Sequence, residues 1–372
     1  EVCGQYPGGQ CYGDFGEFCA VPYRGTLTVL ASASGTQVTI TPTAFTLAAN
    51  DGSVGAMSPG QPYTYSLEPF QVLNVVTSQD QGDLTGTVIS ATKPVAVFGG
   101  HESSVSSDQC CTDHLEQQLF PTKSWGKHYL ATKSYTRGFE RDYWRILAME
   151  DETTVTFNPP NIEPQHVLNR GQWFEIATTQ DFEINGDKPI TVAQVLASSH
   201  EVTSVPLGTA CGSDFDCDYQ SGYTCLTIDI MGNTACYPPF CFGETDTSCP
   251  SGHSCTCFGL DCACFPIGDP AMILAPPVEQ FRKDYVFLSP DAYIYDYVNI
   301  VAPTGTVVTL DGVNLPSVNF KPIGNTGYTV ARQLVSDGVH TIVANNPVGV
   351  VAYGYDKDVS YGYTAGMNLN DL

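Results

Sequence analysis

The chain has 372 residues, which is long enough for two or three domains. Its 39 Asp and Glu outnumber 15 Lys and Arg, so the formal net charge is -24, and a surface of this kind repels nucleic acid and anionic membrane faces. No apolar run reaches the roughly 18 residues that a membrane-spanning helix needs.

The cysteine content indicates the compartment. Fifteen cysteines in a chain of this size are typical of an oxidising environment, so we expect a secreted, extracellular or cell-surface protein. The chain starts at Glu1 without a signal peptide, as expected of a mature or trimmed start. No Asn-x-Ser/Thr sequon occurs, which favours a bacterial secreted protein.

The chain repeats a pair of segments three times. The opening segments are 27–40, 144–157 and 298–310, and each contains two short apolar strands around a small turn. The closing segments are 89–102, 184–201 and 340–355, and a proline introduces the apolar strand of each (Pro94, Pro189 and Pro347). This repetition predicts an all-β fold of three antiparallel β-sandwich-like modules.

In chain order, the pattern predicts seven segments. They are a Cys/Gly-rich lead-in at 1–25, β module 1 at 26–105, a connector at 106–141, β module 2 at 142–204, a Cys-rich insert at 205–268, a connector at 269–297, and β module 3 at 298–372. The strands expected in module 1 are 26–33, 36–41, 62–67, 70–77, 84–91 and 94–99. In the first connector, DHLEQQLF at 113–120 predicts a short helix that begins at Asp113 and stops at Pro121.

The insert carries ten of the fifteen cysteines, and a segment so poor in aliphatic residues needs cross-links to fold. These ten are Cys211, Cys217, Cys225, Cys236, Cys241, Cys249, Cys255, Cys257, Cys262 and Cys264. Zinc sites usually contain C-x2-C pairs, which are absent here, so we predict disulfides of open connectivity. The other five are Cys3, Cys11, Cys19, Cys110 and Cys111, and their odd number leaves one thiol that is free or joins another chain.

Three further groups are candidate sites. Asp214, Asp216 and Asp218 alternate along an extended segment and either bind calcium or form a solvated acidic loop; no other cofactor is predicted. The tyrosines near the C-terminus are candidate contacts for a partner or a sugar ring, and the alternative is ordinary cross-strand packing. These are Tyr293, Tyr295, Tyr297, Tyr353, Tyr355, Tyr361 and Tyr363. The pairs His101-Glu102 and His200-Glu201 lack the H-E-x-x-H pattern, and we predict no catalytic residue.

Several motifs resemble a known family. KPVAVFGGHE (93–102), Cys111, DHLEQQLFPTKSWGKHYL (113–130) and the end of the chain (337–342 and 347–369) resemble the N-terminal domain of the IgGFc-binding protein and its bacterial relatives. Ser103 stands where the resemblance leads us to expect a cysteine, and the insert at 205–268 departs from the family. The resemblance implies an extracellular, β-rich binding or structural module.

Together these features favour a secreted, non-enzymatic adhesion or surface-assembly protein. Its expected partners are its own copies, in a fibre or layer, or an extracellular protein or glycan. The alternative is a carbohydrate-binding module assisted by calcium. A third hypothesis is a hydrolase with a cleft between modules.

Overall fold

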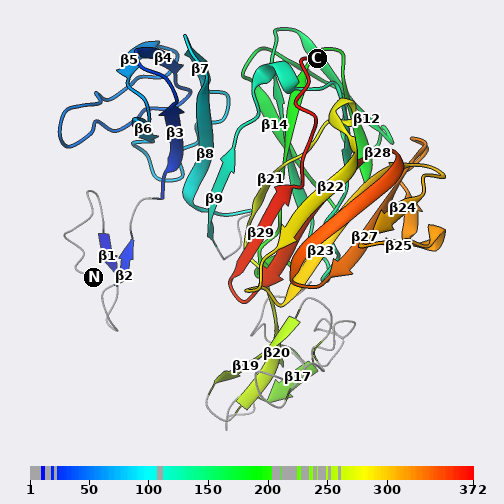
Figure 1. Cartoon of the computed structure of the whole chain (residues 1–372). Helices are drawn as coiled ribbons and strands as arrows, with labels where there is room; N and C mark the ends of the chain where they lie inside the picture. The colour runs from blue at the N-terminus through cyan, green and yellow to red at the C-terminus, as the bar shows by residue number, and fades with distance from the viewer. Residues whose placement is uncertain are drawn as a thin grey trace. The chain divides into compact units, whose positions relative to one another are not determined.

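The computed structural model describes residues 10–12, 18–20, 23–106, 112–202, 211, 224–227, 234–237, 241, 249, 253–258 and 261–372. In this part of the chain there are strands and short 3₁₀ turns but no α-helix, so the all-β prediction is confirmed (Figure 1). The chain forms two compact units. Unit 1 comprises Glu1–Ser104 and His114–Phe120, and unit 2 comprises Val105–Asp113 and Pro121–Leu372.

Unit 1 contains a sandwich of two antiparallel sheets, with strand orders β6-β3-β8-β9 and β5-β4-β7. Its strands are β3 (Gly25–Ala31), β4 (Thr36–Thr41), β5 (Tyr63–Leu67), β6 (Val72–Val76), β7 (Val88–Ala91), β8 (Val95–Ser104) and β9 (Asp113–Gln118). Along β3, every second side chain is buried, as expected for a strand with one face on the core. Val29, Val38 and Ile40 are fully buried between the two sheets.

The helix predicted at 113–120 is wrong, because most of this segment is β9. Leu115 is buried while His114 and Glu116 on either side are exposed, which is the alternation of a strand. The reason lies on the neighbouring strand: a side chain at Gly100 would place its Cβ 2.0 Å from the Leu115 carbonyl oxygen. The glycine lets the two backbones approach, and this signal is invisible within the segment itself.

Unit 2 begins with a second sandwich, whose sheets have the orders β10-β15-β12-β13 and β14-β11-β16-β21. Its strands are β10 (His128–Ala131), β11 (Asp142–Ala148), β12 (Thr153–Asn158), β13 (His166–Leu168), β14 (Trp173–Thr178), β15 (Phe182–Gly186), β16 (Ile190–Val195) and β21 (Met272–Leu274). Trp144 and Phe182 meet edge to face in its core. Two of these strands, β10 and β21, come from stretches expected to be connectors.

Unit 2 ends with a third sandwich, in which one strand serves both sheets (Figure 1). Its strands are β22 (Arg282–Ser289), β23 (Tyr295–Pro303), β24 (Val308–Leu310), β25 (Val313–Asn314), β26 (Phe320–Pro322), β27 (Tyr328–Val335), β28 (Gly338–Asp356) and β29 (Val359–Thr364). The first part of β28 pairs with β22 and β24, and the part after Pro347 pairs with β23 and β29. Proline has no N–H to donate, so it suits the point where the strand changes sheet.

The three sandwiches share one pairing pattern. The first strand of each opening segment pairs with the strand that follows the proline, in β3–β8, β11–β16 and β23–β28. The second strand pairs with the strand that precedes the proline, in β4–β7, β12–β15 and β24–β28.

The cysteine-rich insert lies in one loop of this pattern. A further strand borders each closing strand (β9, β21 or β29), and the insert lies in the connection between β16 and β21. Its described hairpins are β17 (Thr224–Thr227) with β18 (Thr234–Tyr237) and β19 (His253–Phe258) with β20 (Asp261–Pro266). In the lead-in, β1 (Gln10–Tyr12) pairs with β2 (Phe18–Ala20).

Gly268, where the chain leaves the insert, generates a prediction. Its φ is +95°, and an added Cβ would lie 2.5 Å from an Arg137 nitrogen and 2.7 Å from the Tyr355 ring. Gly312 also has a positive φ (+78°), but nothing lies within 4 Å of its Cβ position. We expect Gly312→Ala to cost about 1 kcal/mol of backbone strain, and Gly268→Ala to cost a further 1–3 kcal/mol or so from overpacking. Urea unfolding of both variants measures the difference, and equal losses would contradict this view of Gly268.

Candidate functional site

Six charged side chains gather inside unit 2, three of them on the loop between β10 and β11 and a fourth at the first residue of β11. Those four are almost inaccessible: Lys133, Arg137, Glu140 and Asp142 are between 0% and 5% exposed. The other two, Asp181 and Arg332, are half-buried beside them. We call these six residues the buried charge network. Charges are rarely this buried unless they are paired, so their contacts decide whether the loop is stable.

The centre of the network is the ion pair between Lys133 and Glu140, with 2.9 Å from Nζ to Oε1. The Glu140 carboxylate also accepts the backbone N–H groups of Arg137, at 2.9 Å, and Gly138, at 2.8 Å. Burial by itself would raise the pKa of Glu140, but Arg137, Lys133 and these N–H donors hold that pKa below its usual value. The carboxylate is therefore ionised and fully engaged.

Asp142 is the second carboxylate beside Lys133, with 3.9 Å from its Oδ1 to Nζ. It accepts hydrogen bonds from the backbone N–H of Ser134 at 2.6 Å and from the Ser134 hydroxyl at 2.9 Å. The side-chain amide of Gln194, on β16, donates a further bond at 2.6 Å. These contacts fix the loop against the core of the second sandwich.

Arg137 joins the network to the two ends of the insert. Its guanidinium donates to the carbonyl oxygen of Ala197, before the insert, at 2.7 Å, and to that of Ile267, at the C-terminal end of the insert. The guanidinium also lies over the Tyr355 ring, 4.2 Å from its centroid. One side chain thus holds the base of the insert together and binds it to β28.

The third sandwich contacts the same loop through hydrogen bonds. The amide of Asn299, on β23, donates to the Lys133 carbonyl oxygen at 3.0 Å and accepts the Tyr353 hydroxyl at 2.9 Å. Arg332, on β27, donates its Nε–H to the same carbonyl at 2.9 Å and forms an ion pair with Asp181. The loop is therefore fixed to both sandwiches of unit 2.

A cavity of about 440 Å³ opens beside the network. It is lined by Lys133, Tyr135, Thr136, Thr179, Asp181, Asn319, Lys321, Val330 and Arg332. The Lys133 ammonium is engaged by Glu140, whereas the exposed Lys321 forms no ion pair with any described residue. Lys321 pairs with Val330 in the β26–β27 register, so Lys321 and Arg332 lie on the same face of the sheet. The cavity thus combines two cations with hydroxyl, amide and aromatic groups.

The tyrosines predicted as a binding surface divide into two groups. Tyr297, Tyr353 and Tyr355 are between 0% and 4% exposed and their rings pack on one another, so they belong to the core. Burial raises the pKa of Tyr353 well above its usual value. The other four, which are half-buried, are Tyr293, Tyr295, Tyr361 and Tyr363. Their role in binding stays a prediction.

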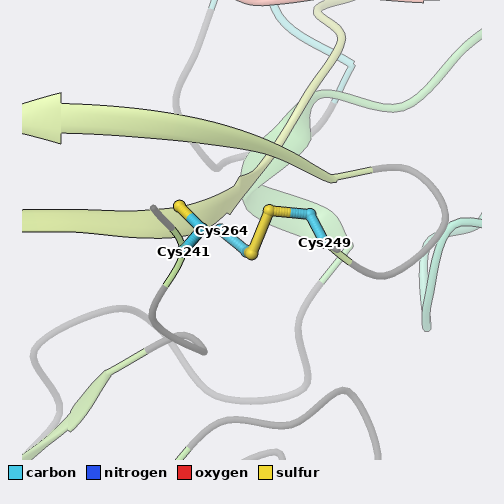
Figure 2. Close-up of side chains that lie close together, drawn as sticks. All are labelled: Cys241, Cys249 and Cys264. Atoms are coloured by element: carbon cyan, nitrogen blue, oxygen red, sulfur yellow. A yellow bond between two sulfur atoms is a disulfide. The ribbon is translucent and has the colours of Figure 1, made fainter. Parts of the chain in front are cut away.

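Four disulfides are described in the insert, and no described cysteine is free. They are Cys211–Cys225, Cys241–Cys255, Cys249–Cys264 and Cys257–Cys262. The sulfur atoms of Cys241, Cys249 and Cys264 lie within 4.8 Å of one another, at a distance that would suit a metal ion (Figure 2). Each is already half of a disulfide, so none is a thiolate ligand.

Some predicted site residues lie outside the described part of the chain. These are Cys3, Cys110, Cys111, Cys217, Asp214, Asp216 and Asp218, together with the side chains of Cys11, Cys19, Cys236 and His200. The calcium hypothesis therefore stays a prediction. Of the two His-Glu pairs, His101-Glu102 lies on β8 in unit 1. Glu201 in unit 2 accepts the Tyr143 and Ser106 hydroxyls at 2.6 and 2.8 Å, which are structural contacts.

The buried charge network was missed from the sequence, although a signal was present. Basic residues number only 15 in the whole chain, and three of them (Lys133, Arg137 and Arg141) fall within nine positions of one expected connector. Such a concentration in an acidic chain marks a place where carboxylates must be paired.

The fold and site define a disulfide-containing, all-β protein of antiparallel sandwiches with a cavity lined in part by charged and polar groups. A family model described as IgGFc binding protein matches residues 17–221 and 253–354, and the chain belongs to this family. Residues 222–252, between the two matched segments, lie within the Cys-rich insert. The described part of the chain contains no helix capable of spanning a membrane.

Individual relatives are more distant. The human IgGFc-binding protein is 29% identical over 166 residues, which are 44% of this chain and 3% of that protein. Among solved structures, an anti-sigma factor domain-containing protein from Clostridium clariflavum is 10% identical and covers 70% of this chain and 80% of its own. Its TM-score of 0.14 is too low to indicate a shared fold.

The Lys133–Glu140 pair generates a second prediction. Lys133→Met removes the cation that lies closest to Glu140 and also lies beside Asp142, and leaves Arg137 alone near two buried carboxylates, so we expect a loss of about 3–5 kcal/mol in the free energy of unfolding. Arg145 and Glu175 form a half-exposed pair at 3.1 Å, and Arg145→Met is the matched control, with an expected loss below about 1 kcal/mol. Chemical denaturation compares the two variants. Similar losses in the free energy of unfolding would show that the buried pair contributes no more to stability than the half-exposed pair.

A third prediction concerns Asp269, which is 3% exposed and whose Oδ1 accepts no hydrogen bond within the described structure. Burial, followed by the nearby carboxylates of Asp358 and Asp113, raises its pKa to about 6. The folded state then binds more protons than the unfolded state between about pH 4 and 6, so stability falls as pH rises through this window. We expect Asp269→Asn to abolish that fall and to stabilise the protein at pH 7, by up to about 3 kcal/mol. Thermal unfolding across pH measures this, and a less stable variant at pH 7 would contradict it.

Proposed function

We propose that this protein is an extracellular, non-enzymatic adhesion or surface-assembly protein that binds other proteins, its own copies included. The four disulfides support an extracellular location, because such bonds persist in oxidising compartments. Membership of a family named for binding supports a binding role. The name of the human relative states that it binds IgG Fc, but this chain spans 3% of that protein, so Fc is only one partner to test.

The observation that carries the proposal is an apolar face on the third sandwich. It consists of Val286, Leu288, Val339 and Val343, which are 69%, 54%, 68% and 58% exposed. Leu288 and Val339 are direct cross-strand partners on β22 and β28, and the other two follow at even spacing, so all four lie on one face. We call this set the apolar face.

Folding alone does not explain the apolar face. On a sheet with one solvated side, outward positions are usually polar, yet here Val and Leu occupy four of them, beside the polar partners Thr341 and Asp284. The core behind is filled by Tyr285, Phe287 and Ile342. Contiguous exposed apolar side chains mark contact sites. Full burial of each stabilises a complex by about 1.5–3 kcal/mol. We therefore assign the protein contact to this face.

Net charge sets the conditions for such a contact. Two copies that each carry -24 repel one another at low ionic strength, and salt screens this repulsion while leaving apolar attraction in place. Association between copies should therefore strengthen as salt is added.

Carbohydrate binding is the second candidate function, and it is favoured by the cavity beside Arg332. A role for calcium through Asp214, Asp216 and Asp218 remains a proposal.

The apolar face is tested by placing a charge on it. We expect the wild-type protein to associate as concentration and salt rise, and Val339→Lys to remain monomeric, because an ammonium cannot be buried in an apolar contact. Leu334→Lys, at a side chain that is 62% exposed on β27, is the control and should associate like the wild type. Sedimentation velocity and electron microscopy provide the readout.

Two results would count against the proposal. If the wild-type protein stays monodisperse in all these conditions, the self-assembly hypothesis is excluded. If Val339→Lys also binds Fc and intact cells of the source organism as the wild type does, the apolar face is not the contact site.

A further inference from the structure

The cavity beside Arg332 concentrates positive charge in a strongly acidic protein. Three of the 15 basic residues line it, and two of them, Arg332 and Lys321, lie on one face of the β26–β27 pair. Asp181 balances the charge of Arg332 in their ion pair, so Lys321 supplies the net positive charge. An anionic group is therefore attracted to this cavity, although most of the protein repels it.

Arg332 is held in place before any ligand arrives. Its Nε–H donates to the Lys133 carbonyl oxygen and one of its terminal nitrogens bonds to Asp181, which together use two of the five N–H donors of a guanidinium. The donors that remain form a planar group suited to a carboxylate. Both partners of Arg332, Lys133 and Asp181, belong to the buried charge network. The Arg332 side chain is therefore already ordered, and it loses little conformational entropy when a ligand binds.

The rest of the lining is rich in neutral hydrogen-bonding groups. Thr136 and Thr179 offer hydroxyls, Asn319 offers an amide, and Tyr135 offers an aromatic ring whose own stacking on Tyr297 fixes its position. At about 440 Å³ the cavity has the volume of a small-molecule site, and its groups come from several segments. Hydroxyls, an amide and a ring complement a compact ligand that carries several hydroxyls of its own.

From these features we infer that the cavity binds the terminal residue of an acidic saccharide, with the sugar carboxylate on Arg332 and Lys321 and its hydroxyls on Thr136, Thr179 and Asn319. A single residue fits better than a long polyanion, because most of the acidic protein repels the following charges. An acidic peptide lacks the hydroxyls that the neutral lining would bind. This inference stands apart from the apolar face, which lies on β22 and β28.

The test uses two sugars that differ only in the carboxylate. Methyl glucuronide and methyl glucoside are titrated into the full chain by calorimetry, with ligand-observed NMR as a second readout. We expect the glucuronide to bind at least about ten-fold more tightly, since hydrogen bonds to charged groups contribute roughly 1.5–3 kcal/mol. Added salt should weaken this binding, which is opposite to its effect on association between copies.

Variants locate the site. Lys321→Gln removes an exposed charge without touching the core, and we expect it to weaken glucuronide binding by about two- to five-fold. Lys283→Gln makes the same change at an exposed lysine on β22 and should leave binding unchanged. Arg332→Gln should abolish binding, and its thermal unfolding is measured alongside to separate lost contacts from lost folding.

Several outcomes would overturn the inference. Equal binding of the two sugars, or no binding of either, removes the carboxylate site. If Lys321→Gln and Lys283→Gln bind the glucuronide with equal affinity, the binding site is not this cavity. A glutamate-rich peptide or a heparin fragment that binds more tightly than the glucuronide, and loses that binding in Lys321→Gln, would show that the ligand is a polyanion instead.

Discussion

The ion pair between Lys133 and Glu140 is the constraint on which the rest of unit 2 depends. Two ions of opposite charge in the interior are stable only if nearly every donor and acceptor around them is satisfied. In the observed conformation of the loop, the Lys133 carbonyl oxygen accepts hydrogen bonds from Asn299 and Arg332 of the third sandwich, and Arg137 contacts both ends of the insert. A single buried pair thereby coordinates three parts of the chain that could otherwise move independently.

Local patterns were sufficient to predict the all-β class and strands β3 to β8 of the first sandwich, but not β9, β10 or β21. The expected strand 36–41 is β4, and its buried and partly exposed side chains alternate as the spacing of Val38 and Ile40 predicts. The prolines at 94, 189 and 347 precede or interrupt closing strands because a residue without an N–H is tolerated where a ladder begins or changes sheet. The extents of the modules are less local, because β10 and β21 join the second sandwich from outside 142–204.

Long-range contacts explain what the sequence could not predict. Lys133 and Asn299 are 166 positions apart, and no periodicity links them. Strand β9 depends on Gly100 of the neighbouring strand β8. The disulfide between Cys241 and Cys255 joins a residue outside the β19–β20 hairpin to one on β19, and the spacing of the cysteines does not specify this pairing. The tyrosines show the same effect, since Tyr293 and Tyr353 look alike in sequence, yet only the second lies in the core.

The engagement of the buried carboxylates bears on the choice between binding and chemistry. A general acid or base must exchange a proton with a substrate, so at least one of its oxygens must be accessible. Both oxygens of Glu140 and both oxygens of Glu201 accept hydrogen bonds from the protein itself. The cavity beside Arg332 instead presents hydrogen-bond donors and the cation of Lys321, groups that suit the binding of an anion. The contacts that stabilise the scaffold therefore occupy both oxygens of Glu140 and of Glu201, and neither carboxylate is placed to exchange a proton with a substrate.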